Sequence, residues 1–293
     1  MAAHPEDRHV MGQGTESSAT TSPADARRIA EAFVQARLAG RALGAYPGRV
    51  PADLEGGYAC QDAAIALWPD RVIGWKVGYI ASNRRDASGD DRLVGPIFGA
   101  MLRTAHPGTI TEFPVFDGGF AAVEAEYVVR LGADAPPGKR DWTAGEAAAL
   151  AGALHVGIET AGSPLATINQ LGPTVVVSDF GNNAGLILGP EIADWRGPAL
   201  ESLRCETWID NRCVGRGGAA ALEGGPMGAL AFALARLARR GRPLRAGDLV
   251  STGAATGIHD IRAGESARVD FGAAGTLHCR AVPMRGGAVD AAC

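Results

Sequence analysis

The sequence places two glutamates one residue apart in the stretch VEAEYVV, between Val123 and Val129. Valine and tyrosine favour an extended strand, in which successive side chains point to opposite faces, so Glu124 and Glu126 are predicted to share one face. If that face is buried, both carboxylates can ionise only beside a cation or strong hydrogen-bond donors. The alternative is an edge strand whose glutamate face is solvated. The pair therefore requires either a partner or water.

Glu159 supplies a third carboxylate at the end of the apolar run HVGIE, before the small-residue turn TAGSP. The end of a strand is a place where a side chain reaches the mouth of a site. Three carboxylates on two strands offer hard oxygen ligands, which suit Mg²⁺ or Mn²⁺, whereas zinc favours histidine or cysteine. Such a cage leaves coordination positions for water or a chelating substrate.

Two histidines are further candidates, one near Glu159 and one that follows the Thr252-Gly253 pair. His155 precedes Glu159 by four residues and would face the same way on an alternating strand, which makes it a candidate acid or base. A histidine satisfied within the core is the alternative. His259, in GIHD, is equally well explained as a surface residue.

Composition bounds the kind of protein that positions these groups. With 293 residues, 46% of them hydrophobic, and a net charge of -4, the chain is predicted to be a soluble globular protein of one large or two modest domains. Its 28 basic residues are scattered among 32 acidic ones, and no apolar run reaches the roughly 18 residues that span a bilayer. We therefore expect small-molecule chemistry or a protein partner, as a homo-oligomer, and no nucleic-acid or membrane partner. Five cysteines without CxxC spacing indicate a reducing compartment, with the cytoplasm as the default.

Capping residues and the spacing of apolar residues predict four helices. They run from the N-cap Ser22 to Gly40, from Asp53 to Trp68, over TAGEAAALAGAL from Thr143, and over MGALAFALARLARR from Met227. Around them we divide the chain into a disordered tail (1–22), a helical N-terminal region (23–75), a β-roll catalytic domain (76–283) and a C-terminal tail (284–293).

Short apolar runs bounded by glycine predict the strands. They are RVIGWKVGYI, AEYVVRL, HVGIET, TVVVSDF, LILG, CETWIDNRCVG with a hairpin turn at Asp210 and Asn211, DLVSTG, SARVDFG and TLHCRAV. Because strands outnumber helices and the C-terminal third is hairpin-like, we predict an α+β protein with a mixed, curled sheet. The stretch GRGGAAALEGGP is not a dinucleotide fingerprint, because no βαβ unit surrounds it.

Several of these segments together resemble the fumarylacetoacetate hydrolase superfamily, and most closely its 2-keto-4-pentenoate hydratase and 4-oxalocrotonate decarboxylase branch. The shared motifs, in order, are GWKVG around Lys76, EAE at 124–126, IE at Glu159, LILG at 186–189 and GRPLRAGDLVSTGA at 241–254. The resemblance implies a mixed β-roll with packed helices, and a divalent metal held by Glu124, Glu126 and Glu159. It also implies a 2-keto acid substrate that chelates this metal.

The resemblance assigns roles to three further residues. Lys76 would place an ammonium near the substrate as a charge partner or proton donor, where a lysine on a surface strand is the alternative. Thr252 and Gly253 match the position where a hydroxyl and backbone N–H groups receive the substrate carboxylate. Without the resemblance, this pair is a strand-ending turn.

Two departures from the branch are evident. Its hydratases show an aspartate after the lysine strand where this chain has Leu93 or Val94, so the usual acid for water activation is absent, and Asp91 is the candidate substitute. Asp179 is followed by Phe180 where the family commonly has asparagine, which predicts an aromatic wall in the substrate pocket. Both changes indicate a more apolar pocket.

Three hypotheses follow from these residues. The first is a metal-dependent lyase that hydrates or decarboxylates a 2-keto (enol) acid. The second is a C–C bond hydrolase or tautomerase of the same superfamily, and the third is a relative that binds a ligand without turnover. The glutamate trio and Lys76 favour an enzyme, whereas the missing aspartate favours the non-catalytic relative. If the protein is an enzyme, the missing aspartate favours decarboxylation or tautomerisation.

Overall fold

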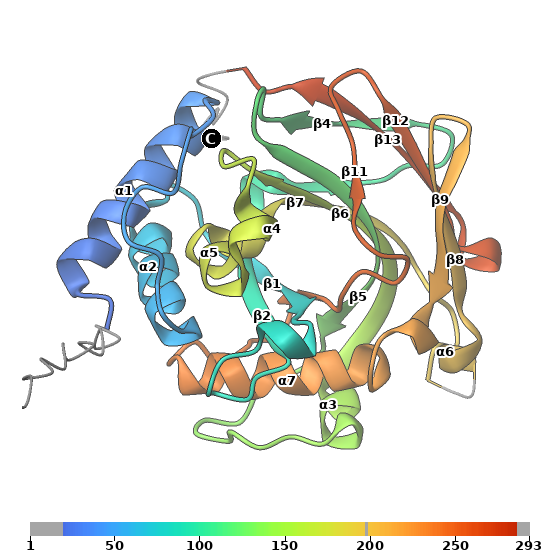
Figure 1. The fold of residues 1–293 in the computed structure, drawn as a ribbon. Helices are drawn as coiled ribbons and strands as arrows, with labels where there is room; N and C mark the ends of the chain where they lie inside the picture. The colour runs from blue at the N-terminus through green and yellow to red at the C-terminus, as the bar shows by residue number, and fades with distance from the viewer. Residues whose placement is uncertain (1–19, 197–198, 286–293) are drawn as a thin grey trace, which may run out of the picture.

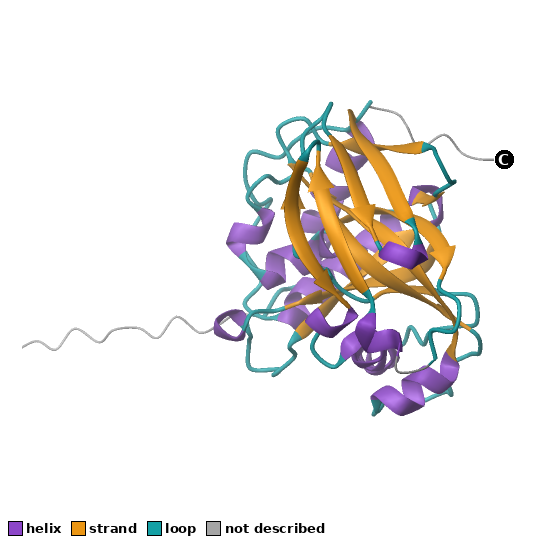
Figure 2. Cartoon of the chain, turned by 90° about the vertical axis from the view of Figure 1, so that its right-hand side faces the viewer, coloured by secondary structure: helices purple, strands orange, loops and turns teal. Residues whose placement is uncertain are grey.

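Two curled β-sheets form the centre of the protein, seen in a computed structural model that describes residues 20–196 and 199–285 (Figure 1). Within this part of the chain the strands wind around the middle of the molecule, with α1 and α2 on one side and α3 and α7 below. Viewed from the strand side, the curved strands lie in front and most helices lie behind and below them (Figure 2).

The first sheet carries the predicted glutamates and has the strand order β2-β1-β10-β5-β6-β7-β3, with β11 paired to β5. Its β1–β10 and β3–β7 pairs are parallel and its other pairs are antiparallel. The strands are β1 (Val72–Tyr79), β2 (Arg92–Phe98), β3 (Leu102–Thr104), β5 (Phe120–Leu131), β6 (Ala151–Ser163), β7 (Asn183–Glu191), β10 (Leu249–Ser251) and β11 (His259–Asp260).

The second sheet has the order β4-β13-β12-β8-β9 and is mixed as well, because β4 runs parallel to β13. Its strands are β4 (Ile110–Val115), β8 (Arg204–Ile209), β9 (Arg212–Gly218), β12 (Ser266–Asp270) and β13 (Thr276–Pro283). Asp210 and Asn211 connect β8 to β9, which confirms the predicted hairpin turn. The predicted mixed, curled sheet is therefore present as two sheets.

Seven α-helices cover these sheets in the described residues. They are α1 (Pro23–Ala39), α2 (Leu54–Leu67), α3 (Ala144–Leu150), α4 (Ile168–Leu171), α5 (Pro173–Ser178), α6 (Ala199–Ser202) and α7 (Gly225–Arg239). The predicted caps of the first helix are confirmed, because the Ser22 side chain accepts from the Asp25 N–H and Gly40 takes a left-handed conformation at φ 62°. No helix in 20–196 or 199–285 is long and apolar enough to cross a membrane.

Two predicted elements are wrong. TVVVSDF is not a strand but α5 followed by a tight turn, because Gly172 and Pro173 start a helix whose valines are buried, which overrides their strand propensity. The helix from Thr143 ends at Leu150, and the next residues extend β6 along β5. The alanine-rich sequence is compatible with a helix or a strand here, and pairing with β5 makes it a strand.

The helices and both sheets share one large hydrophobic core, to which Phe33 of α1, Tyr127 of β5 and Leu234 of α7 contribute fully buried side chains. The predicted division of the chain stays a prediction, and most of both predicted tails, residues 1–19 and 286–293, lies outside the described residues. The four described cysteines are free thiols.

Candidate metal centre

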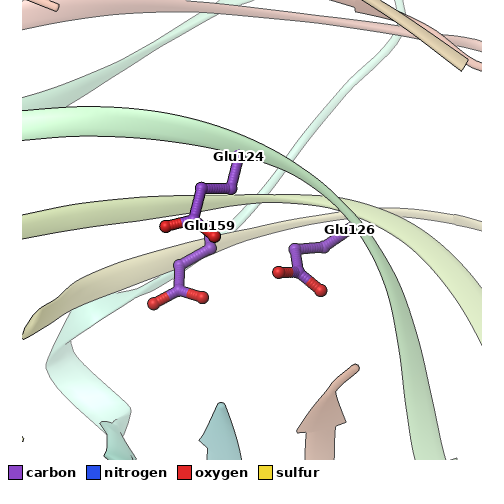
Figure 3. A group of neighbouring side chains, drawn as sticks. All are labelled: Glu124, Glu126 and Glu159. Carbon is purple, nitrogen blue, oxygen red and sulfur yellow. The ribbon is translucent and has the colours of Figure 1, made fainter. Parts of the chain in front are cut away.

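Glu124, Glu126 and Glu159 converge on one point of the first sheet (Figure 3). Strands β5 and β6 pair antiparallel with Glu124 opposite Glu159, and Glu126 lies two residues along β5 on the same face. Each of the three residues offers an oxygen within 4.8 Å of the others. Glu159 does not end its strand, as the sequence suggested, because β6 continues to Ser163. The solvated-edge alternative is excluded, since all three side chains are buried.

The carboxylate oxygens are only partly satisfied by the protein. Glu126 Oε2 accepts the backbone N–H of Gly253 at 2.7 Å, and Glu159 Oε1 accepts Asn183 Nδ2 at 3.0 Å. Glu124 Oε1, Glu126 Oε1 and Glu159 Oε2 are buried and accept no hydrogen bond from the described residues. A buried carboxylate oxygen without a donor is costly, and three around one point form the donor set of a hard divalent cation. The residues present therefore fit Mg²⁺ or Mn²⁺.

Burial also changes the proton affinity of this cluster. Removal from water raises the pKa of Glu124 to about 7, opposed by the positive charge of Lys76 and reinforced by the negative charge of Glu159. Removal from water likewise raises the pKa of Glu126 well above its ordinary value, and the charges of Glu159 and Glu124 add to this effect. Protons therefore bind the cluster readily where a cation is absent.

Lys76 points into the same cluster from β1. Its side chain is buried, which excludes the surface-strand alternative, and Nζ lies 3.3 Å from Glu159 Oε1 and 3.2 Å from Asn182 Oδ1, to which it donates. Burial alone would lower the pKa of Lys76, but the charges of the three glutamates together outweigh it and raise the pKa. Lys76 is therefore held as an ammonium.

Asn182 and Asn183 were not predicted as site residues. Asn182 ends a tight turn in which Phe180, Gly181 and Asn182 all have positive φ, at 56°, 64° and 56°. Such angles are uncommon for residues other than glycine and concentrate at functional sites. Gly95 of β2 allows the turn to approach, because a Cβ there would lie 2.1 Å from the Phe180 carbonyl oxygen. The polar pair within GNNAG was the available sequence signal.

A cavity of about 590 Å³ opens in front of the cluster. Lys76, Glu124 and Asn182 lie in its wall together with Thr252 and Gly253, so the structure brings these predicted residues to one place. Glu126 and Glu159 are not in the wall, but each has an oxygen within 4.8 Å of one of Glu124. The rest of the wall includes the apolar side chains of Leu93, Val176, Leu222 and Ile258 and the guanidinium groups of Arg84 and Arg92.

No family model matches the chain. The 2-keto-4-pentenoate hydratase of Burkholderia vietnamiensis is 29% identical over 188 residues, which are 63% of this chain and 68% of that protein. The 4-oxalocrotonate decarboxylase from Pseudomonas putida G7, complexed with magnesium and adipate, superposes with a TM-score of 0.75 at 19% identity, over 90% of this chain and 99% of that chain.

The fumarylpyruvate hydrolase from Pseudomonas aeruginosa, in complex with Mn²⁺ and pyruvate, superposes with a TM-score of 0.52 at 19% identity, over 74% of this chain and 91% of that chain. This chain has the fumarylacetoacetate hydrolase fold. The predicted resemblance and the predicted α+β class are both confirmed.

Within this fumarylacetoacetate hydrolase fold, the Thr252 hydroxyl and the Gly253 N–H both donate hydrogen bonds to other protein groups. The Thr252 hydroxyl donates to the Tyr127 carbonyl oxygen at 2.7 Å, and the Gly253 N–H donates to Glu126. Both residues shape the cavity wall next to the glutamate cluster. The Thr252 hydroxyl can still accept a hydrogen bond, since only its proton is used.

Asp91 and His155 do not lie in the cavity wall. The Asp91 carboxylate pairs with Arg92 at 2.6 Å, and the arginine, not the aspartate, faces the cavity. His155 of β6 lies opposite Val128 of β5, and its Nδ1 is 3.2 Å from the Gly189 carbonyl oxygen. For this ring nitrogen, the alternative of a histidine with a hydrogen-bond partner inside the protein therefore holds. The catalytic roles predicted for Asp91 and His155 stay predictions, but neither residue lines the cavity.

Asp179 and Phe180, which were predicted to bind substrate, also lie outside the cavity wall. The carboxylate of Asp179 is paired instead with Arg37, a residue that the sequence analysis did not single out. Arg37 of α1 is buried and its Nε lies 2.5 Å from Asp179 Oδ1, while the Ser163 hydroxyl donates to Asp179 Oδ2 at 2.6 Å. The ring of Phe180 packs against those of Trp68 and Phe98, with centroids 5.5 Å and 4.9 Å away, so it forms core and not a pocket wall.

Proposed function

We propose that the protein is a divalent-metal-dependent lyase that acts on a 2-keto (enol) acid. The observation that carries this proposal is the group of three buried glutamates, each with an unpartnered oxygen, at a cavity that also holds the ammonium of Lys76. The similarity to a 2-keto-4-pentenoate hydratase and to the fold of a 4-oxalocrotonate decarboxylase complexed with magnesium supports it. Mg²⁺ or Mn²⁺ is the proposed cofactor, a small 2-keto acid the proposed substrate, a homo-oligomer the proposed assembly and the cytoplasm the proposed location.

The glutamates and Lys76 divide the work in this proposal. Glu124, Glu126 and Glu159 would hold the cation, which when bound acts as a Lewis acid toward the carboxylate and 2-oxygen of a 2-keto acid. Lys76 has three N–H donors, and Glu159 and Asn182 orient the ammonium at the cavity wall. An ammonium fixed there stabilises negative charge that develops on the substrate and can supply a proton to it.

The acidic residues of the cavity wall indicate which of the possible reactions is favoured. Among the described residues that form it, Glu124 belongs to the metal cluster and the other acidic residue, Glu223, lies on the exposed rim. Asp91, the candidate substitute for the missing acid, is paired with Arg92. Addition of water needs a base that activates the water. Tautomerisation moves a proton from the enol oxygen to carbon, and loss of CO₂ leaves an enolate that takes up a proton. Both reactions need a stabilised electron pair and a proton donor such as Lys76, but no base that activates water. We therefore favour decarboxylation or tautomerisation over hydration and C–C bond hydrolysis.

Ultraviolet and mass analysis of 2-hydroxydienoates and 4-oxalocrotonate, incubated with the purified protein and Mg²⁺, distinguishes these reactions. Loss of CO₂ from 4-oxalocrotonate identifies a decarboxylase, and a change in absorbance without a change in mass identifies a tautomerase. Gain of one water, or fragmentation, would show that hydration or hydrolysis proceeds without a dedicated acid. The Glu124→Gln variant is the control, because it removes one metal ligand and retains the shape of the side chain. Unchanged substrates with every metal would favour the non-catalytic relative.

A further inference from the structure

The segment from Thr252 to Ile258, which we call the cavity loop, joins β10 to β11 and forms one wall of the cavity. Its backbone lies along β5, because the Ala255 N–H donates to the Ala125 carbonyl oxygen at 2.8 Å and β11 pairs with β5. Within the loop, the Gly253 N–H donates to Glu126 Oε2. The position of the cavity loop therefore fixes one oxygen of a predicted metal ligand.

The other side of the cavity loop contacts the second sheet. Thr207 of β8 and Thr256 of the loop share a hydrogen bond between their hydroxyl oxygens at 2.7 Å, and Thr256 Oγ1 lies 3.2 Å from His259 Nε2. The Gly218 N–H of β9 also donates to the Ala255 carbonyl oxygen at 3.2 Å. We call Thr207, Thr256 and His259 the latch, since they connect the two sheets through the cavity loop.

The glycine-rich end of β9 makes this contact possible. A Cβ on Gly217 would lie 1.8 Å from the Ala255 carbonyl oxygen, and one on Gly215 would lie 2.5 Å from His259 Nε2. Real Cβ atoms do not approach other atoms so closely. The sequence GRGG, which does not fit a dinucleotide fingerprint, is thus explained by the close approach of β9 to the cavity loop.

We propose that the latch residues are positioning residues, which hold the cavity loop so that Gly253 orients Glu126 for the cation. None of the three side chains touches the carboxylate cluster directly, so they act through the loop backbone. The second sheet then has a role in the site as well as in the core. For catalysis this inference rests on the proposed function, but the order of the loop can be measured without substrate or metal.

Hydrogen exchange of the metal-free full-length protein tests the structural part. Thr256→Val keeps the shape of the side chain and removes both hydroxyl contacts, and Thr256→Ser restores them. Thr111→Val is the control, because Thr111 is a half-buried threonine on β4, at the edge of the second sheet opposite to β9. Loss of a net hydrogen bond is expected to speed exchange in peptides from Thr252 to Ile258 on the order of fivefold. Thr256→Ser and Thr111→Val should exchange like the wild type there.

Calorimetric titration with Mn²⁺ then tests the link to the metal site. We expect Thr256→Val to bind Mn²⁺ several-fold more weakly than the wild type, with Thr256→Ser close to wild type. Unchanged exchange in Thr256→Val would overturn the latch, and so would faster exchange with unchanged Mn²⁺ affinity, because the loop would then not position Glu126. If the wild type itself binds no metal, both the proposed function and the link between the latch and Glu126 are wrong. Hydrogen exchange of the metal-free protein then still shows whether the latch holds the cavity loop.

Discussion

Glu124 and Glu159 face each other across the β5–β6 pair, and each has a buried oxygen that accepts no hydrogen bond from residues 20–196 or 199–285. Two carboxylates in this position repel each other, and of the three carboxylates in the cluster only that of Glu159 lies within 4 Å of Lys76 Nζ. A single ammonium cannot balance three buried carboxylates. The geometry therefore favours a divalent cation in this cluster.

Glu124→Gln and Glu126→Gln are each expected to abolish binding of Mg²⁺ and Mn²⁺ with little loss of stability, because each removes a charge whose partner is the cation and not the core. Calorimetric titration measures the affinity and thermal unfolding measures the fold. Glu112→Gln is the matched control, since it changes an exposed glutamate on strand β4 of the second sheet. Unchanged affinity in both site variants would contradict the assignment.

Removal of metal by excess chelator is expected to lower the melting temperature. A ligand that binds only the folded state stabilises it by mass action, by about 2.7 kcal/mol at a concentration one hundred times its dissociation constant. The cation also relieves the repulsion among the buried carboxylates. Differential scanning calorimetry with and without chelator measures the effect, and the Glu124→Gln variant should show no shift. An equal melting temperature for the wild type in both conditions would argue against a cation in the site.

The gain in melting temperature from metal is expected to be larger at pH 8 than at pH 6. Burial raises the pKa of Glu124 to about 7 in the metal-free protein, above its value in the unfolded chain. The stability from its protonated form is therefore complete below the unfolded pKa and is lost as the pH rises through about 7. Protons also compete with the cation below that pH, which weakens metal binding. A metal-induced shift that does not change between pH 6 and pH 8 would show that Glu124 titrates elsewhere.

Asp179→Asn is expected to destabilise the protein by about 3–5 kcal/mol, because it leaves the buried guanidinium of Arg37 without its charge partner. The carboxylate is fully buried and accepts from both Arg37 and Ser163. Chemical denaturation measures the loss, and the Arg37→Met, Asp179→Leu double variant should lose less than Asp179→Asn alone. A stable Asp179→Asn variant with weakened substrate binding would instead restore Asp179 to the substrate pocket.

Local spacing in one strand identifies Glu124 and Glu126, whereas the assignment of Glu159 as a third ligand and of a role to Lys76 depends on the family resemblance. The sequence does not reveal Arg37, which is 142 positions from Asp179 and reads as an ordinary basic residue in the last turn of a helix. Asn182 and Asn183 are missed for a related reason. Their approach to Lys76 and Glu159 depends on the tight turn after α5, in a segment whose valines predict a strand.

The same limitation affects the second sheet. The hairpin at Asp210 and Asn211 follows from its turn residues, but the contact between Thr207 and Thr256 joins segments 49 positions apart. Capping and turn chemistry act over a few residues, and apolar periodicity shows which face of an element is buried. Neither identifies which face of another element it meets, so the latch could be seen only in the fold.

Lys76→Met is expected to reduce turnover far more than substrate binding. If the ammonium stabilises charge that forms as the substrate reacts, its contribution is larger in the transition state than in the ground state, and loss of one such contact costs on the order of a hundredfold in rate. Methionine keeps the length of the side chain and removes the charge. Steady-state kinetics with the best substrate found, paired with a binding titration, separates the two effects.

The chain offers a matched control, because Lys139 is its only other lysine and lies in an exposed ion pair with Glu146. Lys139→Met should leave turnover unchanged. We expect Lys76→Arg not to restore activity, because a larger, planar guanidinium replaces a compact ammonium at a buried position. Turnover in Lys76→Met equal to that of the wild type would remove the ammonium from the mechanism. If the wild type shows no turnover and Lys76→Met loses ligand binding, the protein is a ligand-binding protein and not an enzyme.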